Sequence, residues 1–160
     1  MKIIPLGKGL DAYVDDSDYE LVSMFSWWEC EGYAVRALPR RGQKNSPLQM
    51  MHVFLLGKED GREIDHRNGN GLDNQRGNLR QASHSENLAN RGKPTGTYAS
   101  AFKGVTWSRN AGKWRAYIKK DYRQKHLGYF ELETDAAAAH DTAAKQIYGE
   151  FAQTNLPNRH

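Results

Sequence analysis

Four polar residues between positions 65 and 87 could together hydrolyse a phosphodiester bond: Asp65, His66, Asn78 and Asn87. Such hydrolysis needs a nucleophilic water and a sink for the charge of the departing oxygen. Histidine has a pKa near neutrality and can accept a proton from water. Carboxylate and amide oxygens, as in Asp65 and Asn87, are ligands suited to Mg²⁺ or Mn²⁺. These residues are therefore a candidate proton acceptor and a candidate metal site.

A strand, a loop and a second strand must bring these residues together. We expect short strands at residues 62–66 and 79–82, joined by the Asn- and Gly-rich loop 67–78. Adjacent strand residues point to opposite sides of a sheet. Asp65 and His66 can therefore serve one site only if the first strand ends there.

Helices and further strands are expected on either side of this unit. Residues 83–86, Ser-His-Ser-Glu, match a capping box and predict a helix that begins there. The acidic stretch 15–20 predicts another short helix, capped by Asp15 or Ser17. Residues 48–56 are almost continuously apolar and fit either a helix or a strand. Short strands are also expected at residues 2–6, 12–14 and 33–38, and an exposed hairpin tip at 39–47.

The same polar residues belong to a group of short motifs: Ile64-Asp65-His66-Arg67-Asn68-Gly69-Asn70, Leu72-Asp73-Asn74, Asn78-Leu79-Arg80 and Asn87. Together, over about residues 52–91, they resemble the HNH endonuclease family, especially its phage and intron-associated homing members. The resemblance implies a ββα-metal fold in which His66 is the general base and Asn78 holds the histidine-bearing strand in place. It also implies that Asp65 and Asn87 bind one Mg²⁺ or Mn²⁺ ion. Asn87 stands where many members have histidine, so the metal preference stays open.

Further cationic and imidazole groups surround these motifs. Arg67, Arg76 and Arg80 could grip a DNA backbone through their guanidinium groups, and ordinary surface charge is the rival interpretation. His52, inside the apolar stretch, either approaches a phosphate or is a buried histidine, and it is left outside the catalytic set. His84, near the expected helix start, either contacts phosphate or faces solvent, and solvent is favoured.

Positive charge is concentrated in one segment of the chain. Residues 91–130 hold 10 Lys and Arg against one acidic residue, whereas residues 1–90 hold 11 against 13 and residues 131–160 hold 2 against 5. Aromatic residues are interleaved with the cations of the basic segment. This composition favours a surface for a polyanion, above all a nucleic acid, and a solvated basic face is the alternative.

The basic segment predicts three antiparallel strands followed by a helix. The strands are expected within residues 102–107, 112–118 and 126–130. In the second strand, three apolar residues alternate with Arg115, Tyr117 and Lys119, so one face is core and the other is exposed. Trp107 and Trp114 are expected in the core. Thr134 and Asp135 are the expected caps of the helix.

A second set of motifs covers this region: Lys103-Gly104-Val105, Trp114-Arg115-Ala116-Tyr117-Ile118, Leu127-Gly128-Tyr129-Phe130 and Asn155-Leu156-Pro157. They closely resemble the plant Apetala-two/ethylene-response-factor DNA-binding domain, which also occurs as an appendage on phage endonucleases. The resemblance implies a three-stranded sheet that lies in the major groove of double-stranded DNA. Carried over by position, the implied DNA contacts are Lys103, Thr106, Ser108, Arg115, Tyr117, Lys119 and His126. Several differ from the arginines of the plant proteins, so the plant target sequence cannot be transferred.

These patterns predict an α+β protein with two modules. An HNH nuclease domain is expected at residues 1–92, with its ββα-metal core at about 62–91, then a linker at 93–97. A three-stranded antiparallel sheet packed on one helix is expected at 98–157. The predicted function is that of a homing-type DNA endonuclease with a His general base and one divalent ion. The alternative is a non-catalytic DNA-binding regulator that retains a nuclease-derived scaffold.

Composition limits where such a protein would act. The 160 residues have a mean hydropathy of −0.84 and contain no apolar run that could cross a bilayer. The start of the chain lacks the pattern of a secretory signal, and one cysteine, Cys30, excludes an intramolecular disulfide. We therefore expect a cytoplasmic protein, and the resemblance to phage and intron-associated endonucleases implies that a phage or mobile element encodes it. Oligomeric state and the choice between nicking and double-strand cleavage stay open.

Overall fold

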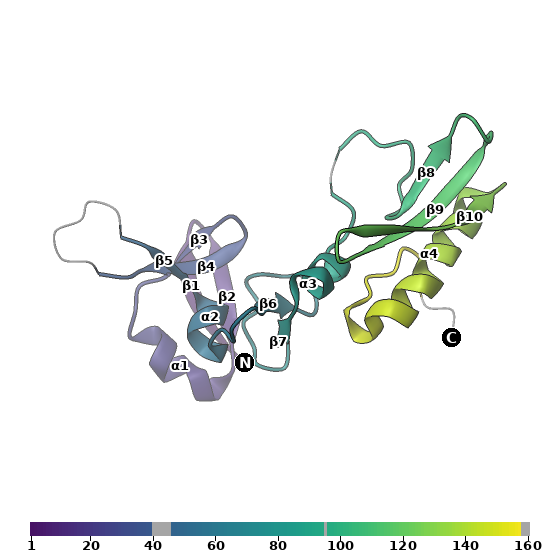
Figure 1. Ribbon diagram of the computed structural model, residues 1–160. Coiled ribbons are helices and arrows are strands. Elements are labelled where there is room, and N and C mark those ends of the chain that lie inside the picture. Colours follow the sequence, from purple (N-terminus) through teal and green to yellow (C-terminus); the bar gives the residue numbers. More distant parts are fainter. Residues whose placement is uncertain (40–45, 95, 158–160) are drawn as a thin grey trace. The chain divides into compact units, whose positions relative to one another are not determined.

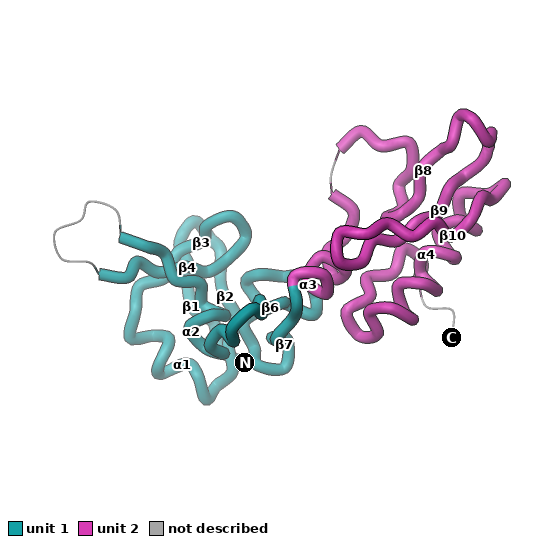
Figure 2. The backbone as a smooth tube through the Cα atoms, viewed as in Figure 1, with its two compact units in different colours: residues 1–83 teal, residues 84–160 magenta. Residues whose placement is uncertain are grey.

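The computed structural model describes residues 1–39, 46–94 and 96–157, and the chain divides into two compact units (Figure 2). Unit 1 is residues 1–83 and unit 2 is residues 84–160. Both contain helices and strands, which confirms the expected α+β class (Figure 1). Most of the expected hairpin tip at 39–47 lies outside the described residues. Across the described ranges, no helix is long and apolar enough to span a membrane.

Unit 1 is built from short antiparallel strands and two short helices. Its elements are β1 (Lys2–Gly7), β2 (Leu10–Val14), α1 (Asp16–Ser23), β3 (Trp28–Cys30), β4 (Tyr33–Ala37), β5 (Leu48–Met50), α2 (Met51–Leu56), β6 (Glu63–His66) and β7 (Leu79–Ala82). The strands pair as β1-β2, β3-β4-β5 and β6-β7. One apolar core joins them, and its most buried side chains include Val14, Val22 and Met51.

Two local expectations for unit 1 need correction. The apolar stretch 48–56 is neither one helix nor one strand, because β5 gives way to α2 at Met51. Met51, His52 and Leu55 are then buried together on the helix. Asp15 does occupy the position before α1, but its side chain caps no helix N–H. Its carboxylate instead accepts the backbone N–H of Arg76 at 2.8 Å.

Unit 2 consists of a short helix, a sheet and a long helix. Its elements are α3 (His84–Asn90), β8 (Val105–Ser108), β9 (Lys113–Lys120), β10 (Arg123–Phe130), α4 (Glu133–Tyr148) and the 3₁₀ turn η1 (Gly149–Phe151). The three strands form an antiparallel sheet that packs on α4, as in Apetala-two/ethylene-response-factor domains. Alanines of α4 allow this close approach, because Ala136 and Ala137 lie fully buried against Ala116 and Val105.

Two further expectations in unit 2 fail. Residue 132 precedes α4 and offers no side-chain cap, so Thr134 and Asp135 lie inside the first turn instead of capping it. Trp107 is 41% exposed and is not a core residue. Its ring contacts that of Trp114 edge to face, with centroids 5.2 Å apart, and of the two only Trp114 packs against the core.

Candidate active site and DNA-contacting sheet

His66 lies at the last position of β6, and it is only 5% exposed. Its Nε2 faces the side-chain oxygen of Asn74 at 3.5 Å. Asn74 is fully buried and donates its amide to the carbonyl oxygen of Gly71 at 3.4 Å, which directs its own oxygen toward the imidazole. An acceptor at Nε2 favours the tautomer with the proton on Nε2 and the lone pair on Nδ1.

The protonation of His66 suits a base. Burial lowers the pKa of His66 from its ordinary value of 6.5, against the opposing effects of Asn74, Asp65 and Asp73. The imidazole is therefore neutral at pH 7. A neutral imidazole can accept a proton from water, whereas an imidazolium cannot.

Two aromatic rings pack against this imidazole. The ring of His52, on α2, stands at 88° to that of His66 with centroids 4.8 Å apart, and Tyr33 of β4 contacts both. His52 is 5% exposed, so its expected burial is confirmed. Burial, assisted by the electrostatic effect of the neighbouring His66, lowers the pKa of His52 to about 4. Its Nδ1 is buried and has no hydrogen-bond partner among the described residues.

Asp65 precedes His66 on the same strand and faces Arg80 of β7 in the register of the hairpin. The Nε and Nη2 atoms of Arg80 lie 2.9 and 2.8 Å from one carboxylate oxygen, Oδ2. Both side chains are buried. The structure thus gives Arg80 a protein partner inside the fold, where DNA would not reach the guanidinium without breaking this pair.

The loop between the two strands is held by asparagine side chains. The oxygen of Asn78 accepts the backbone N–H of Asn68 at 3.0 Å, and its amide donates to the carbonyl of Asp73 at 2.7 Å. Backbone bonds of 2.8 Å then tie Leu72 and Asn74 to Tyr13 of β2. Asn78 therefore shapes the loop that follows His66 and presents Asn74 to it.

The two remaining arginines of the loop, Arg67 and Arg76, are both exposed. Arg67 is exposed directly after His66. Arg76 is bound through two nitrogens, each 2.8 Å from a carboxylate oxygen of Asp18 on α1. Because Arg67 is exposed and directly follows His66 in the chain, it is the candidate for a phosphate contact in unit 1.

Asn87 lies on α3 and belongs to unit 2, where its side chain is half-buried. His84 at the start of the same helix is exposed, as favoured, and stacks on Tyr122 with centroids 6.3 Å apart. Within the described part of the chain, no group of three or more His, Cys, Asp or Glu could hold a metal. A metal would therefore need an amide oxygen or non-protein ligands as well.

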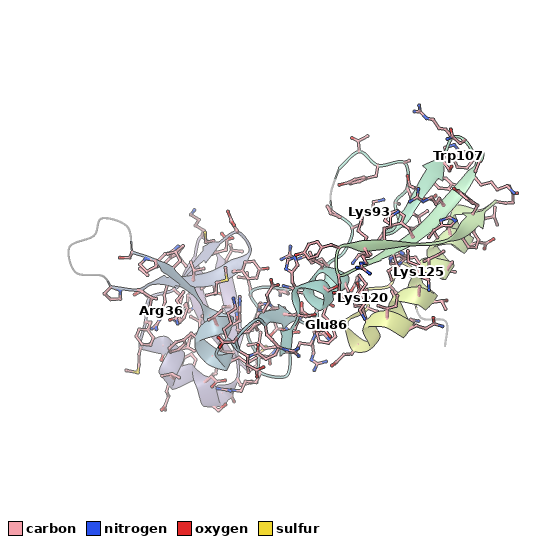
Figure 3. The ribbon with its side chains drawn as sticks, in the orientation of Figure 1. Arg36, Glu86, Lys93, Trp107, Lys120 and Lys125 are labelled. Carbon is pink, nitrogen blue, oxygen red and sulfur yellow. The ribbon has the colours of Figure 1, made fainter. Side chains whose placement is uncertain are left out.

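Six of the seven expected DNA-contacting residues share one face of the unit 2 sheet. On β9, Arg115, Tyr117 and Lys119 alternate with the buried Ala116 and Ile118. Cross-strand pairing places the others beside them, because Thr106 opposes Arg115, Ser108 opposes Lys113, and His126 opposes Tyr117. Lys120 and Lys125 come from the same two long strands, β9 and β10 (Figure 3). The face opposite α4 is therefore polar, aromatic and cationic.

Lys103 is the exception, because it precedes β8 and its ammonium is bound by the protein. Its Nζ donates to the carbonyl oxygens of Leu88, Ala89 and Arg91 at 2.9, 2.8 and 2.6 Å. Burial lowers the pKa of Lys103 to about 8. The ammonium is thus still mainly charged at pH 7 but is engaged at the end of α3.

Sequence reasoning assigned no role to Asn74 or Tyr33. Asn74 stands inside the quoted Leu72-Asp73-Asn74 motif, so a signal was present, but nothing local shows that its side chain turns to His66. Tyr33 lies 33 residues before His66 on a separate strand, and only the tertiary fold brings the rings to 5.9 Å. Tyr129 was also missed as a member of the sheet face, where it opposes Arg115.

Comparisons with known proteins found one matching family model and several relatives. The family model described as HNH endonuclease matches residues 56–89. Protein 3.8 of Escherichia phage T7 is 31% identical over 90 residues, which are 56% of this chain and 73% of the phage protein. Dehydration-responsive element-binding protein 2D of Arabidopsis thaliana is 43% identical over 58 residues, 35% of this chain. Dehydration-responsive element-binding protein 2A of the same plant is 39% identical over 72 residues, which are 44% of this chain. The chain spans only 28% and 21% of these two plant proteins.

Proposed function

The chain belongs to the family of phage T7 protein 3.8 and contains an HNH endonuclease domain, and on this premise we propose that it is a metal-dependent endonuclease that cuts double-stranded DNA. The observation that carries the proposal is the buried, neutral His66 at the end of β6, held by Asn74 and preceded by Asp65. A buried imidazole with a lowered pKa is a typical feature of a catalytic base.

His66 would accept a proton from a water molecule at Nδ1. The resulting hydroxide attacks the phosphorus in line, and the bond from phosphorus to the 3′ oxygen breaks. The products then carry 5′ phosphate groups. Asn74 would hold the proton on Nε2, so that the lone pair that accepts the proton stays on Nδ1.

The metal ligands implied by the resemblance are Asp65 and Asn87. Their donor set fits Mg²⁺ or Mn²⁺, because a carboxylate and an amide both offer hard oxygen ligands, and Mg²⁺ commonly keeps several waters or substrate phosphate oxygens as its other ligands. When bound, a divalent ion would supply positive charge to the phosphate oxygens of the transition state. Arg80 would fix the orientation of the Asp65 carboxylate through its two contacts. Asn78 would keep the loop in shape.

DNA binding is proposed for the polar face of the unit 2 sheet, with Thr106, Ser108, Arg115, Tyr117, Lys119 and His126 as contacts. The Nε of Arg115 supports this, since it is buried yet has no acceptor among the described residues. A phosphate or guanine acceptor would supply the hydrogen bond that this Nε lacks. In unit 1, Arg67 is the proposed phosphate contact. Arg80 and Lys103, whose cationic groups bind protein atoms, are left out of this set.

The test is digestion of supercoiled plasmid and phage DNA with Mg²⁺ or Mn²⁺. We expect His66→Ala to slow cleavage by roughly a hundredfold to ten-thousandfold, the usual contribution of a general base. DNA affinity should not change. His84→Ala is the matched control, because this histidine is exposed and has no proposed catalytic role. Tight binding without any cleavage by the wild-type protein would instead favour the non-catalytic regulator.

A further inference from the structure

The end of helix α3 is held by a lysine from a distant part of the chain. Lys103 donates three hydrogen bonds to the carbonyls of residues 88, 89 and 91, at the C-terminal end of the helix. The last carbonyls of a helix have no partner within the helix and carry partial negative charge. A cation at this end satisfies the carbonyls and stabilises the helix.

These three hydrogen bonds leave the Lys103 ammonium with no further N–H group to donate to DNA. An ammonium group has three N–H donors. Three carbonyl oxygens at 2.6 to 2.9 Å use all of them. A contact from Lys103 to a phosphate would therefore require the end of α3 to be released.

The backbone of Lys103 is fixed by Asn155, which follows α4 in the chain. Its N–H donates to the side chain of Asn155 at 2.6 Å, and its carbonyl accepts from the same side chain at 3.0 Å. Asn155 is held in turn by Asp141 of α4, at 2.9 Å. At Gly104, with φ +72°, a Cβ would overlap the ring of His140 and the carbonyl oxygen of Tyr117. The backbone from which the Lys103 side chain extends is therefore held in place.

Other contacts also attach α3 to unit 2. Ala89 packs in a cluster with Ile118 of the sheet and Tyr148 of α4, and the hydroxyls of Ser85 and Tyr148 lie 3.3 Å apart. Lys93 just beyond α3 donates to the carbonyls of Ser100 and Phe102, at 2.5 and 3.0 Å (Figure 3). Asn87 lies between two residues of α3 that are both fixed, Ser85 and Ala89.

We infer that Lys103 is a positioning residue, which sets the place of Asn87 by holding α3 on the DNA-binding fold, and that it does not contact DNA. This inference rests on the proposed role of Asn87 as a metal ligand. It means that the nuclease requires unit 2 for the position of a metal ligand as well as for binding DNA.

The experiment compares Lys103→Met with Lys119→Met in the full-length protein. Lys119 is exposed on the proposed DNA face, so its loss should weaken DNA binding and reduce the salt-dependence slope by about one. Lys103→Met should instead leave DNA affinity and the salt slope unchanged. Its single-turnover cleavage should be at least about tenfold slower, and the half-maximal rate should need a higher Mn²⁺ concentration.

Lys103→Arg and hydrogen exchange complete the test. The arginine keeps charge and donors, so it should restore most of the cleavage rate that methionine loses. Amides at the end of α3, such as that of Arg91 just beyond the helix, which donates to the Asn87 carbonyl at 3.3 Å, should exchange at least about tenfold faster in Lys103→Met. The inference is overturned if Lys103→Met behaves like Lys119→Met, or if α3 exchange is unchanged. A wild-type protein that never cleaves would count against the proposed function, while exchange would still decide the role of Lys103 in holding α3.

Discussion

At the residue scale, the proposed role of His66 as a proton acceptor depends more on its surroundings than on its being a histidine. His66 is one of three described histidines whose pKa burial lowers, with His52 and His140. What distinguishes His66 is its place at a strand end beside Asp65 and its contact with Asn74. The residue types and the strand end were predictable from the sequence. The partner at Nε2 was not, because it depends on how a twelve-residue loop folds back.

Replacing Asn74 should therefore slow cleavage without weakening DNA binding. Asn74→Ala removes the oxygen that faces Nε2, so the tautomer and the ring position of His66 are no longer fixed. We expect single-turnover cleavage to fall by as much as about a hundredfold, as for other small misplacements of catalytic groups. Asn74→Asp keeps an acceptor in the same place and should retain more activity than the alanine variant. Equal rates for Asn74→Ala and the wild type would show that His66 needs no such partner.

His52 should make the stability of unit 1 fall in mild acid. Its pKa is about 4 in the folded state and 6.5 ordinarily, so below pH 6.5 the unfolded chain binds a proton that the folded state excludes. Stability is then lost as the pH falls, by about 2 kcal/mol near pH 5 from this residue. Urea unfolding of wild type and His52→Leu, near pH 7.5 and near pH 5, checks this. The variant should lose less stability between the two conditions, and an identical loss would contradict the assignment.

At the scale of elements, patterns that depend on neighbours in sequence were the reliable ones. The alternation of β9, the strand end at His66 and the start of α3 at His84 were all predicted and are confirmed. The division of residues 48–56 was not, because a continuous apolar run carries no period and tertiary burial decides it. Asp15 fits a cap by residue type, but the distant Arg76 N–H takes its carboxylate. Such competition is invisible in a local window.

The loop of residues 67–78 gives a prediction that depends on its packing. A Cβ at Gly71 would overlap the carbonyl oxygen of Gly32 and the ring of Tyr33, which contacts His66. We expect Gly71→Ala to destabilise the protein by roughly 1–3 kcal/mol, the usual cost of overpacking, and to slow cleavage. Gly77→Ala is the matched control, because nothing lies within 4 Å of a Cβ at that position and φ is not positive. Thermal unfolding of both variants measures the difference, and equal losses would contradict the packing argument.

At the scale of the whole molecule, composition located the basic segment but did not locate α3 within the fold. The Gly, Pro and Thr residues after Asn90 mark a break in secondary structure, which suggested a linker at 93–97. The two compact units instead divide between Ser83 and His84, and Lys103 binds the carbonyl of Ala89 across the break that follows Asn90. Long side chains that cross a loop leave no periodic trace in sequence. The domain boundary at residue 92 stays a prediction.

The difference between the two boundaries can be measured with two fragments of unit 2. A fragment of residues 84–160 keeps α3, whereas one of residues 93–160 lacks it. The shorter fragment loses Ala89 from the cluster around Ile118 and Tyr148, and it leaves the partly buried ammonium of Lys103 without its three acceptors. An unsatisfied buried charged group alone costs about 1–3 kcal/mol or more, so the shorter fragment should unfold at a clearly lower urea concentration. Both should bind DNA with the same salt slope where folded, since neither α3 nor Lys103 is a proposed DNA contact. Equal stability of the two fragments would place α3 outside the DNA-binding fold.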